Sequence, residues 1–162
     1  MLRSRIFVAT MIVVGLSWAA EHPADGTLPL GERVFIVSKI YSLIPTFFAH
    51  WKGTPDLDLD AAYRAYLNEI LSSNDRRQFD LATMEFVAKL RNGHTGFWDP
   101  WFIDHYGQPR FFDAKYLGGQ WTITRSSISG LNPGDALVSI DDRPLDQFFA
   151  ERRQYLSGSS ES

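Results

Sequence analysis

The sequence predicts an α+β fold, with a helical N-terminal part followed by a small β-rich part. Before residue 93, apolar residues recur at three- and four-residue spacing in three successive segments, which is the period of helices that bury one face. After that residue the period disappears, and short apolar runs alternate with turns containing glycine or proline, a pattern typical of short strands. The expected divisions are a leader, a linker, a helical domain, a connecting segment, a β-rich domain and a polar tail, at residues 1–19, 20–30, 31–93, 94–110, 111–156 and 157–162.

The first residues have the order of a secretory signal peptide. Arg3 and Arg5 precede an apolar run from Ile6 to Leu16, and the small residues Ser17 and Ala19 follow, which predicts cleavage after Ala19. The alternative is a retained membrane anchor, but the run is shorter than the roughly 18 residues of a spanning helix. We therefore expect an exported protein, periplasmic or extracellular, without a membrane span after cleavage.

The composition excludes several classes of protein. Without Arg3 and Arg5 the net charge falls from −3 to −5, and an acidic chain without a basic stripe is a poor candidate for binding nucleic acid. The chain contains no cysteine, which excludes a disulfide scaffold and thiol catalysis. The aromatic content of 14% favours a packed hydrophobic core.

The first predicted helix covers Glu32 to Trp51. Its apolar stripe consists of Val37, Ile40, Ile44, Phe47 and Trp51. Pro45 lies inside this pattern, and because proline disfavours helical backbone in the residue before it, we expect the helix to end or kink near Leu43.

Two further helices follow. The second is expected to begin after Asp56 or Asp58, either of which could cap it, and to bury Leu59, Tyr63, Tyr66 (or Leu67) and Ile70. The third is expected over Arg76 to Arg91, with Phe79, Thr83, Phe86, Val87 and Leu90 on its buried face. The pair Asn92-Gly93 predicts a left-handed stop at its end.

The β-rich part is predicted to contain three strands and a helix. No helical period is visible from Thr95 to Arg110. The strands are expected at Phe111–Leu117, Gln120–Arg125 and Ala136–Ile140, and the helix at Leu145–Tyr155. Gly118-Gly119 between the first two strands is a hairpin signal, because glycine accepts positive φ angles.

The stretch from Gly130 to Leu145 carries the most specific local pattern. It reads Gly-Leu-Asn-Pro-Gly-Asp, then a buried strand, then Asp-Asp-Arg-Pro-Leu. Pro133 and Gly134 suit a tight turn, and Asp135 can cap it. This stretch resembles bacterial PDZ domains, with Asp142 in place of the usual glycine of the second turn. The alternative is a strand–turn–strand of another β-rich domain. The resemblance implies binding of an extended peptide at a sheet edge.

A second resemblance concerns the end of the third helix. Leu90-Arg91-Asn92-Gly93-His94-Thr95, together with Trp51, the Asp58–Tyr63 stretch and the PDZ-like pattern, resembles the tail-specific, or C-terminal processing, serine peptidases, especially their tricorn-core subgroup. There the matching histidine is the general base for a downstream serine, which implies that role for His94. Asn92 replaces a common Asp, and Gly93 replaces the serine of the tricorn type. The alternative is that His94 caps the helix or bonds a loop carbonyl.

No nucleophile is recognisable in the chain. Neither Gly-x-Ser-x-Gly nor Ser-x-x-Lys occurs, and the serines at 157, 159, 160 and 162 lie in a polar tail. The resemblance therefore implies that residues 1–162 are the N-terminal portion of an exported serine endopeptidase that binds peptide or protein substrates. Its catalytic core would follow residue 162 and pack on this portion, which by itself would be inactive. The alternative is a non-catalytic, peptide-binding adaptor of the cell envelope.

Other candidate sites are weaker. The four histidines lack metal-ligand spacing, so neither a metal nor a cofactor is expected. An aromatic run is interpreted either as a stacking surface for sugar or peptide or as packing between domains; it comprises Phe97, Trp98, Trp101, Phe102 and Tyr106. The acids at 56, 58 and 60 are interpreted as helix-start residues.

Overall fold

The computed structural model describes residues 26–158, and within them it confirms the α+β class. The signal peptide expected at 1–19 lies outside this range. The helices are α1 (Leu30–Phe47), α2 (Leu59–Ser72), α3 (Arg76–Ala88), α4 (Pro100–Tyr106) and α5 (Leu145–Arg152), with short 3₁₀ helices η1 (Trp51–Gly53) and η2 (Arg153–Tyr155). Two antiparallel sheets of two strands each pair β1 (Phe112–Leu117) with β2 (Gln120–Ser126) and β3 (Ser139–Ile140) with β4 (Arg143–Pro144).

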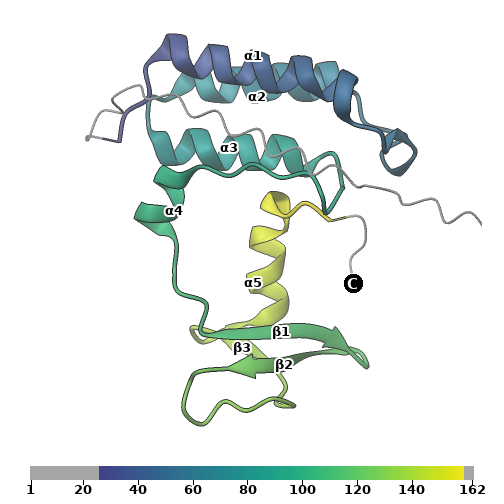
Figure 1. Ribbon diagram of the computed structural model, residues 1–162, viewed down its shortest axis with the longest axis vertical. Coiled ribbons are helices and arrows are strands. Elements are labelled where there is room, and N and C mark those ends of the chain that lie inside the picture. The colour runs from purple at the N-terminus through teal and green to yellow at the C-terminus, as the bar shows by residue number, and fades with distance from the viewer. Residues whose placement is uncertain (1–25, 159–162) are drawn as a thin grey trace, which may run out of the picture.

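These elements form two parts (Figure 1). Helices α1, α2 and α3 lie side by side, and we call them the helical layer. The strands β1 to β4 and helix α5 form a second part, the β unit, which lies below the helical layer in Figure 1. Helix α5 rises from the strands toward α3, and the chain between α4 and β1 makes the other connection.

The core of the helical layer follows the predicted apolar faces of α2 and α3. Tyr66 and Ile70 of α2 are buried, and all five residues expected on the buried face of the third helix are buried. The core cluster consists of Leu28, Val37, Ile44, Phe48, Tyr66, Ile70, Phe79, Ala82, Phe86, Val87 and Leu90. The spacing in the sequence was sufficient here because each helix buries one continuous stripe.

Helix α1 differs from its prediction at its C-terminal end. It includes Pro45 and continues to Phe47, so the end expected near Leu43 is wrong. The helix runs only two residues past Pro45, and the Phe48 N–H still donates to the Ile44 carbonyl at 2.9 Å, so the proline removes one hydrogen-bond donor without breaking the last turn. Phe47 and Trp51 are exposed, so the predicted stripe loses its last two members.

Aspartates cap the two following helices. Asp58, one of the two predicted candidates, accepts a hydrogen bond from the Ala61 N–H at 2.9 Å. Asp75 caps α3 by accepting from the Gln78 N–H at 2.7 Å. Each side chain satisfies a backbone donor that the first turn of a helix leaves without a partner.

Helix α3 ends at Ala88, and its left-handed stop is not where the sequence predicts it. Arg91 has a φ of 48°, whereas Gly93 has no positive φ, so the assignment of the stop to Asn92-Gly93 is wrong. The N–H groups of residues 89–91 each bond a carbonyl three residues earlier, which tightens the chain into 3₁₀ turns after the helix. This tightening turns the chain at Arg91, before the glycine.

Residues 26–29, expected as part of a loose linker, are an ordered strap on the helical layer. Leu28 is buried, and its N–H donates to the Asn74 carbonyl at 3.3 Å. The Arg76 N–H donates to the Gly26 carbonyl at 3.0 Å. The linker prediction is therefore wrong for this part, because the strap covers the start of α3.

Helix α4 lies within the segment for which no helical period was visible. Asp99 caps it by accepting from the Trp101 N–H at 2.9 Å, and Pro100 occupies the first helical position, which suits proline because no N–H is required there. With seven residues, α4 is too short to show a period. The cap and the proline were the signals available in the sequence.

The β1–β2 hairpin confirms its prediction. Gly118 and Gly119 have φ angles of 59° and 89°, as a two-residue hairpin turn requires. The opposite edge of β2 is also paired, because the Ile123 N–H donates to the Asp135 carbonyl and the Gly134 N–H donates to the Ile123 carbonyl, at 2.8 Å each. Ile123 is the buried centre of this unit, with 1% of its surface exposed.

The turns between 130 and 144 agree with the turn chemistry of the sequence. Gly134 has a φ of 100°, and the Asp135 carboxylate accepts from the Asn132 N–H at 2.7 Å. Asp142 adopts the positive φ that the glycine of this turn usually has, at 60°. The strand expected at Ala136–Ile140, however, is reduced to a bridge and β3.

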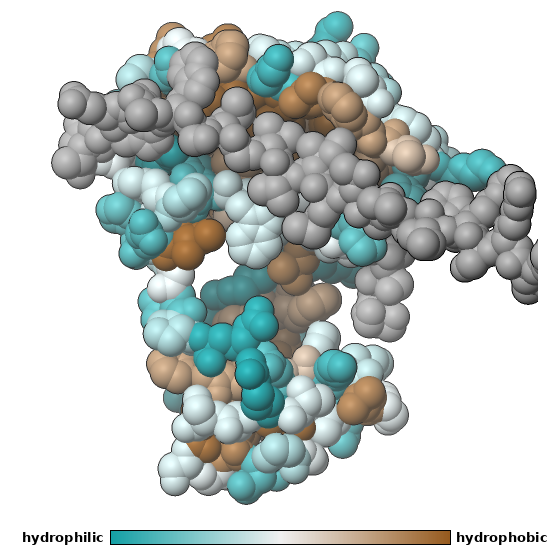
Figure 2. Space-filling model, in the orientation of Figure 1, coloured by the Kyte–Doolittle hydropathy of each residue, from teal (hydrophilic) through white to brown (hydrophobic). Residues whose placement is uncertain are grey.

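The strand expected at Ala136–Ile140 was also predicted to be buried, and this prediction is wrong. Val138 is 73% exposed, because no second layer covers this side of the strands within the described residues. Figure 2 shows apolar surface on the β unit and a hollow between it and the helical layer. No helix within residues 26–158 is long and apolar enough to cross a bilayer.

Candidate functional site

His94, the predicted general base, lies in the turn after α3 and is exposed to solvent. Its backbone N–H donates to Asn92 Oδ1 at 2.8 Å, and Asn92 itself is buried. The side chain of Asn92 therefore fixes the backbone at His94. Within residues 26–158 the ring has no hydrogen-bond partner.

Among the described residues, no hydrogen bond joins the His94 ring to a serine. A serine peptidase requires the nucleophile, its base and an oxyanion hole in one rigid site. Ser157, the described serine of the polar tail, follows η2 and is not bonded to His94. The serines at 159, 160 and 162 lie outside the described residues. Within residues 26–158, His94 is thus an exposed histidine that is not bonded to a serine.

The sequence missed a buried ionic cluster between α3 and α4. Asp80 has 0% of its surface exposed, and Arg76 and Asp99 have 6% each. Arg76 Nε lies 2.9 Å from Asp99 Oδ2 and 3.7 Å from Asp80 Oδ2, and its Nη2 also pairs with Asp99. The Arg76 guanidinium lies 5.5 Å from the ring centre of Trp101.

Burial, and after it the neighbouring Asp99 carboxyl, raise the pKa of Asp80 to about 8, whereas Arg76 opposes the shift. Neither carboxyl oxygen of Asp80 accepts a hydrogen bond from another described group. Perturbed acids of this kind often lie in functional sites, but structural ion pairs produce them too. The enclosure of Asp80 favours a structural role over contact with a substrate.

A signal for this cluster was present in the sequence. Arg76 and Asp80 are four residues apart, which places them on one helix face, and Asp80 directly follows the buried Phe79. A charged pair next to an apolar stripe indicates a buried ion pair or a partner from another element. That partner, Asp99, is 19 residues further along the chain than Asp80, so only the fold identifies it.

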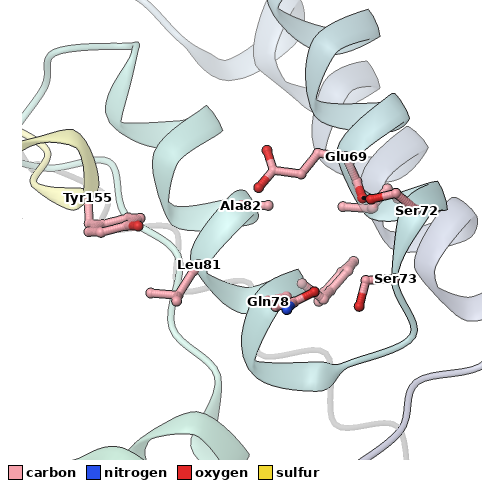
Figure 3. Close-up of a pocket in the computed structure, with 9 residues that line it drawn as sticks. Glu69, Ser72, Ser73, Gln78, Leu81, Ala82 and Tyr155 are labelled. Carbon is pink, nitrogen blue, oxygen red and sulfur yellow. Dashed lines mark hydrogen bonds between the residues drawn. The ribbon is translucent and has the colours of Figure 1, made fainter.

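A shallow pocket of about 230 Å³ lies between the helical layer and η2 (Figure 3). Tyr155 of η2 lies across the pocket from Ser72 and Ser73, at the end of α2. Ser72 donates to the Glu69 carbonyl at 2.6 Å, and Ser73 accepts from the Asp75 N–H at 3.1 Å. The pocket is smaller than the roughly 300–1,000 Å³ of ordinary ligand sites, and its serines serve helix ends.

The predicted aromatic run is divided between packing and exposure. Phe97 packs against the helical core, and Trp101 stacks on His105 with ring centres 4.3 Å apart. Trp98, by contrast, is 80% exposed. Most of this run builds α4 and its contact with α3, so it does not pack the helical layer against the β unit.

The outer edge of β1 is a second candidate site. β1 pairs with β2 on one side, and within the described residues no strand pairs with its other side. Alternate backbone N–H and C=O groups of an edge strand point outward without partners. The exposed side chains of Phe111, Tyr116 and Leu117 lie along this strand.

Comparison with known proteins leaves the family open. No protein-family model matches the chain, and no curated protein matches it.

Proposed function

We propose that residues 1–162 are the N-terminal portion of an exported serine endopeptidase of the tail-specific type. In this proposal residues 111–156 form a PDZ-like module that recruits peptide substrates, and the nucleophile belongs to a catalytic core after residue 162. The proposal rests on the order of three features: the helices, the His94 turn and the Gly130–Leu145 turns.

The unpaired edge of β1 carries the recruiting role. An extended peptide can add to such an edge through main-chain hydrogen bonds, while alternate side chains give specificity. Tyr116 and Leu117 offer apolar surface beside the edge. The opposite edge of β2 is already paired with residues 134–137, which leaves β1 as the acceptor strand.

The exposure of His94 is compatible with a general base that meets its serine from another domain. Its backbone is fixed by Asn92 at 2.8 Å, whereas its ring is free to bond a group that arrives from outside residues 26–158. Such a base contributes about 10²- to 10⁴-fold to the rate of a proton-transfer step.

One observation favours the second candidate, a non-catalytic adaptor. The β1 edge is available without any catalytic core, and His94 has no nucleophile beside it within the described residues. An adaptor would need the edge alone.

Peptide recruitment can be tested by NMR on ¹⁵N-labelled protein. An unstructured apolar decapeptide with a free C-terminus should shift the amide signals of residues 112–117. The same peptide, N-methylated at alternate residues, cannot pair along a strand and should leave them unchanged. Equal shifts with both peptides, or shifts confined to the helical layer, would contradict strand addition.

The enzymatic part can be tested on the complete product of the gene. A fluorophosphonate should label a serine beyond residue 162, and His94→Ala should lower kcat/KM for peptide hydrolysis at least about 100-fold. His50→Ala, which changes another exposed histidine, should leave kcat/KM unchanged. Full activity of His94→Ala would exclude the base assignment, and peptide binding without hydrolysis or labelling would establish the adaptor.

A further inference from the structure

A buried carboxyl pair joins α3 to the chain segment that carries His94 and α4. Asp80 comes from α3 and is fully enclosed, whereas Asp99 lies directly before α4. One guanidinium, that of Arg76, faces both carboxyls. With both acids ionised, two negative charges would share one positive charge away from water, which is costly.

Asp99 is also the group that holds α4 in place. It caps α4 at the Trp101 N–H, 2.9 Å away, and pairs with Arg76 of α3. Trp101 lies under the Arg76 guanidinium and against the strap, since a Cβ built on Gly26 would stand 3.2 Å from the Trp101 ring. A change at Asp80 therefore acts on α4 and on the strap through neighbouring groups.

The charged and titratable groups that act on Asp80 come from three elements. Arg76 and Asp75 belong to its own helix, and Asp99 comes from the start of α4. Tyr66 faces it from α2; burial raises the pKa of this phenol, so it stays neutral near neutral pH. Arg76 is the one cation in this set, and its guanidinium lies closer to the Asp99 carboxylate than to that of Asp80.

We propose that a proton held between Asp80 and Asp99 fastens α4 and the His94 segment to α3, and that loss of this proton releases them. In this proposal the protonated Asp80 is neutral and donates a hydrogen bond to Asp99, which keeps its ion pair with Arg76. The deprotonated Asp80 repels Asp99, and its oxygens have no donor. This inference does not depend on the proposed peptidase.

The direction of the pH response follows from linkage. In the attached state the pKa of Asp80 is raised to about 8, while in a detached state the side chain meets water and titrates near its ordinary pKa of about 3.9. The ratio of attached to detached protein should therefore fall up to about tenfold per pH unit from about pH 4 to about pH 8, and stay constant above.

The test uses ¹⁹F NMR on the full chain labelled with 5-fluorotryptophan, from pH 5 to pH 9.5. The Trp101 signal, assigned with Trp101→Phe, should give way to a solvent-exposed signal as the pH rises. Asp80→Asn, which cannot ionise, should keep the attached signal throughout. Asp75→Asn removes a neighbouring charge while Asn still caps α3, and should respond as the wild type does.

The proposal would be overturned by a Trp101 signal independent of pH in the wild type, or by the same response in Asp80→Asn. If Asp80→Asn does not fold, the ¹³C carboxyl shift of Asp80 in the wild type decides instead. A midpoint near pH 4 in the attached protein would overturn it as well. Loss of helical circular dichroism together with the Trp101 signal would indicate global unfolding and exclude a local release.

Discussion

The hydroxyl groups of Tyr66 on α2 and Thr83 on α3 lie 2.6 Å apart in the buried centre of the helical layer. The Thr83 hydroxyl also donates to the Phe79 carbonyl at 2.7 Å, so it accepts the Tyr66 proton. The Tyr66 ring stacks on Phe86 with ring centres 4.7 Å apart. Two helices are thus joined by one polar contact within an apolar core, and the two partners are not equivalent.

We expect Thr83→Val to cost more stability than Tyr66→Phe. Tyr66→Phe removes the buried donor together with its hydrogen bond, at about 0.5–1.5 kcal/mol, whereas Thr83→Val leaves the tyrosine hydroxyl buried without an acceptor, at about 1–3 kcal/mol. Urea unfolding of both variants measures the difference. The assignment of donor and acceptor would be wrong if Tyr66→Phe were the more costly change.

Stability should fall as the pH rises from about 4 to about 8 because of Asp80. The pKa of this acid is raised to about 8 in the folded protein and is about 3.9 in the unfolded chain, so in this window the folded state binds more protons. The expected slope from this group is at most about 1.4 kcal/mol per pH unit, and it levels off above pH 8.

Asp80→Asn should flatten this dependence and be more stable than the wild type at pH 8.5. Urea unfolding at several pH values, from pH 5 to pH 8.5, gives the comparison. Parallel curves for the two proteins would show that another group is responsible.

Glycine should matter at position 134 and not at position 93. Gly134 has a φ of 100°, a backbone conformation that alanine tolerates poorly, so Gly134→Ala should destabilise by about 1 kcal/mol or more. At Gly93 an added Cβ would meet no atom within 4 Å, and Gly93→Ala should change stability by less than about 0.5 kcal/mol. Thermal unfolding of both variants measures this contrast. A large loss of stability in Gly93→Ala would indicate that the left-handed stop lies at Gly93 after all.

Local sequence features determined most of the elements in this protein. The apolar stripes of α2 and α3 were visible because each helix buries one face, and the β1–β2 hairpin was visible because Gly118 and Gly119 accept positive φ angles. The turn at Gly134 and Asp135 followed from the same local chemistry. These features depend on residues within about one or two turns of each other, so spacing alone reveals them.

Tertiary structure decided which of these elements are covered and which distant residues meet. The buried neighbours of Asp80 include Asp99, a contact that no spacing in the sequence indicates, because it forms only where the start of α4 packs on α3. Val138 is apolar but exposed, because burial requires a second layer and not only an apolar residue. His94 was recognisable as a residue type in a pattern, whereas its exposure depends on how α3 ends, and that end is set by the 3₁₀ turns at residues 89–91.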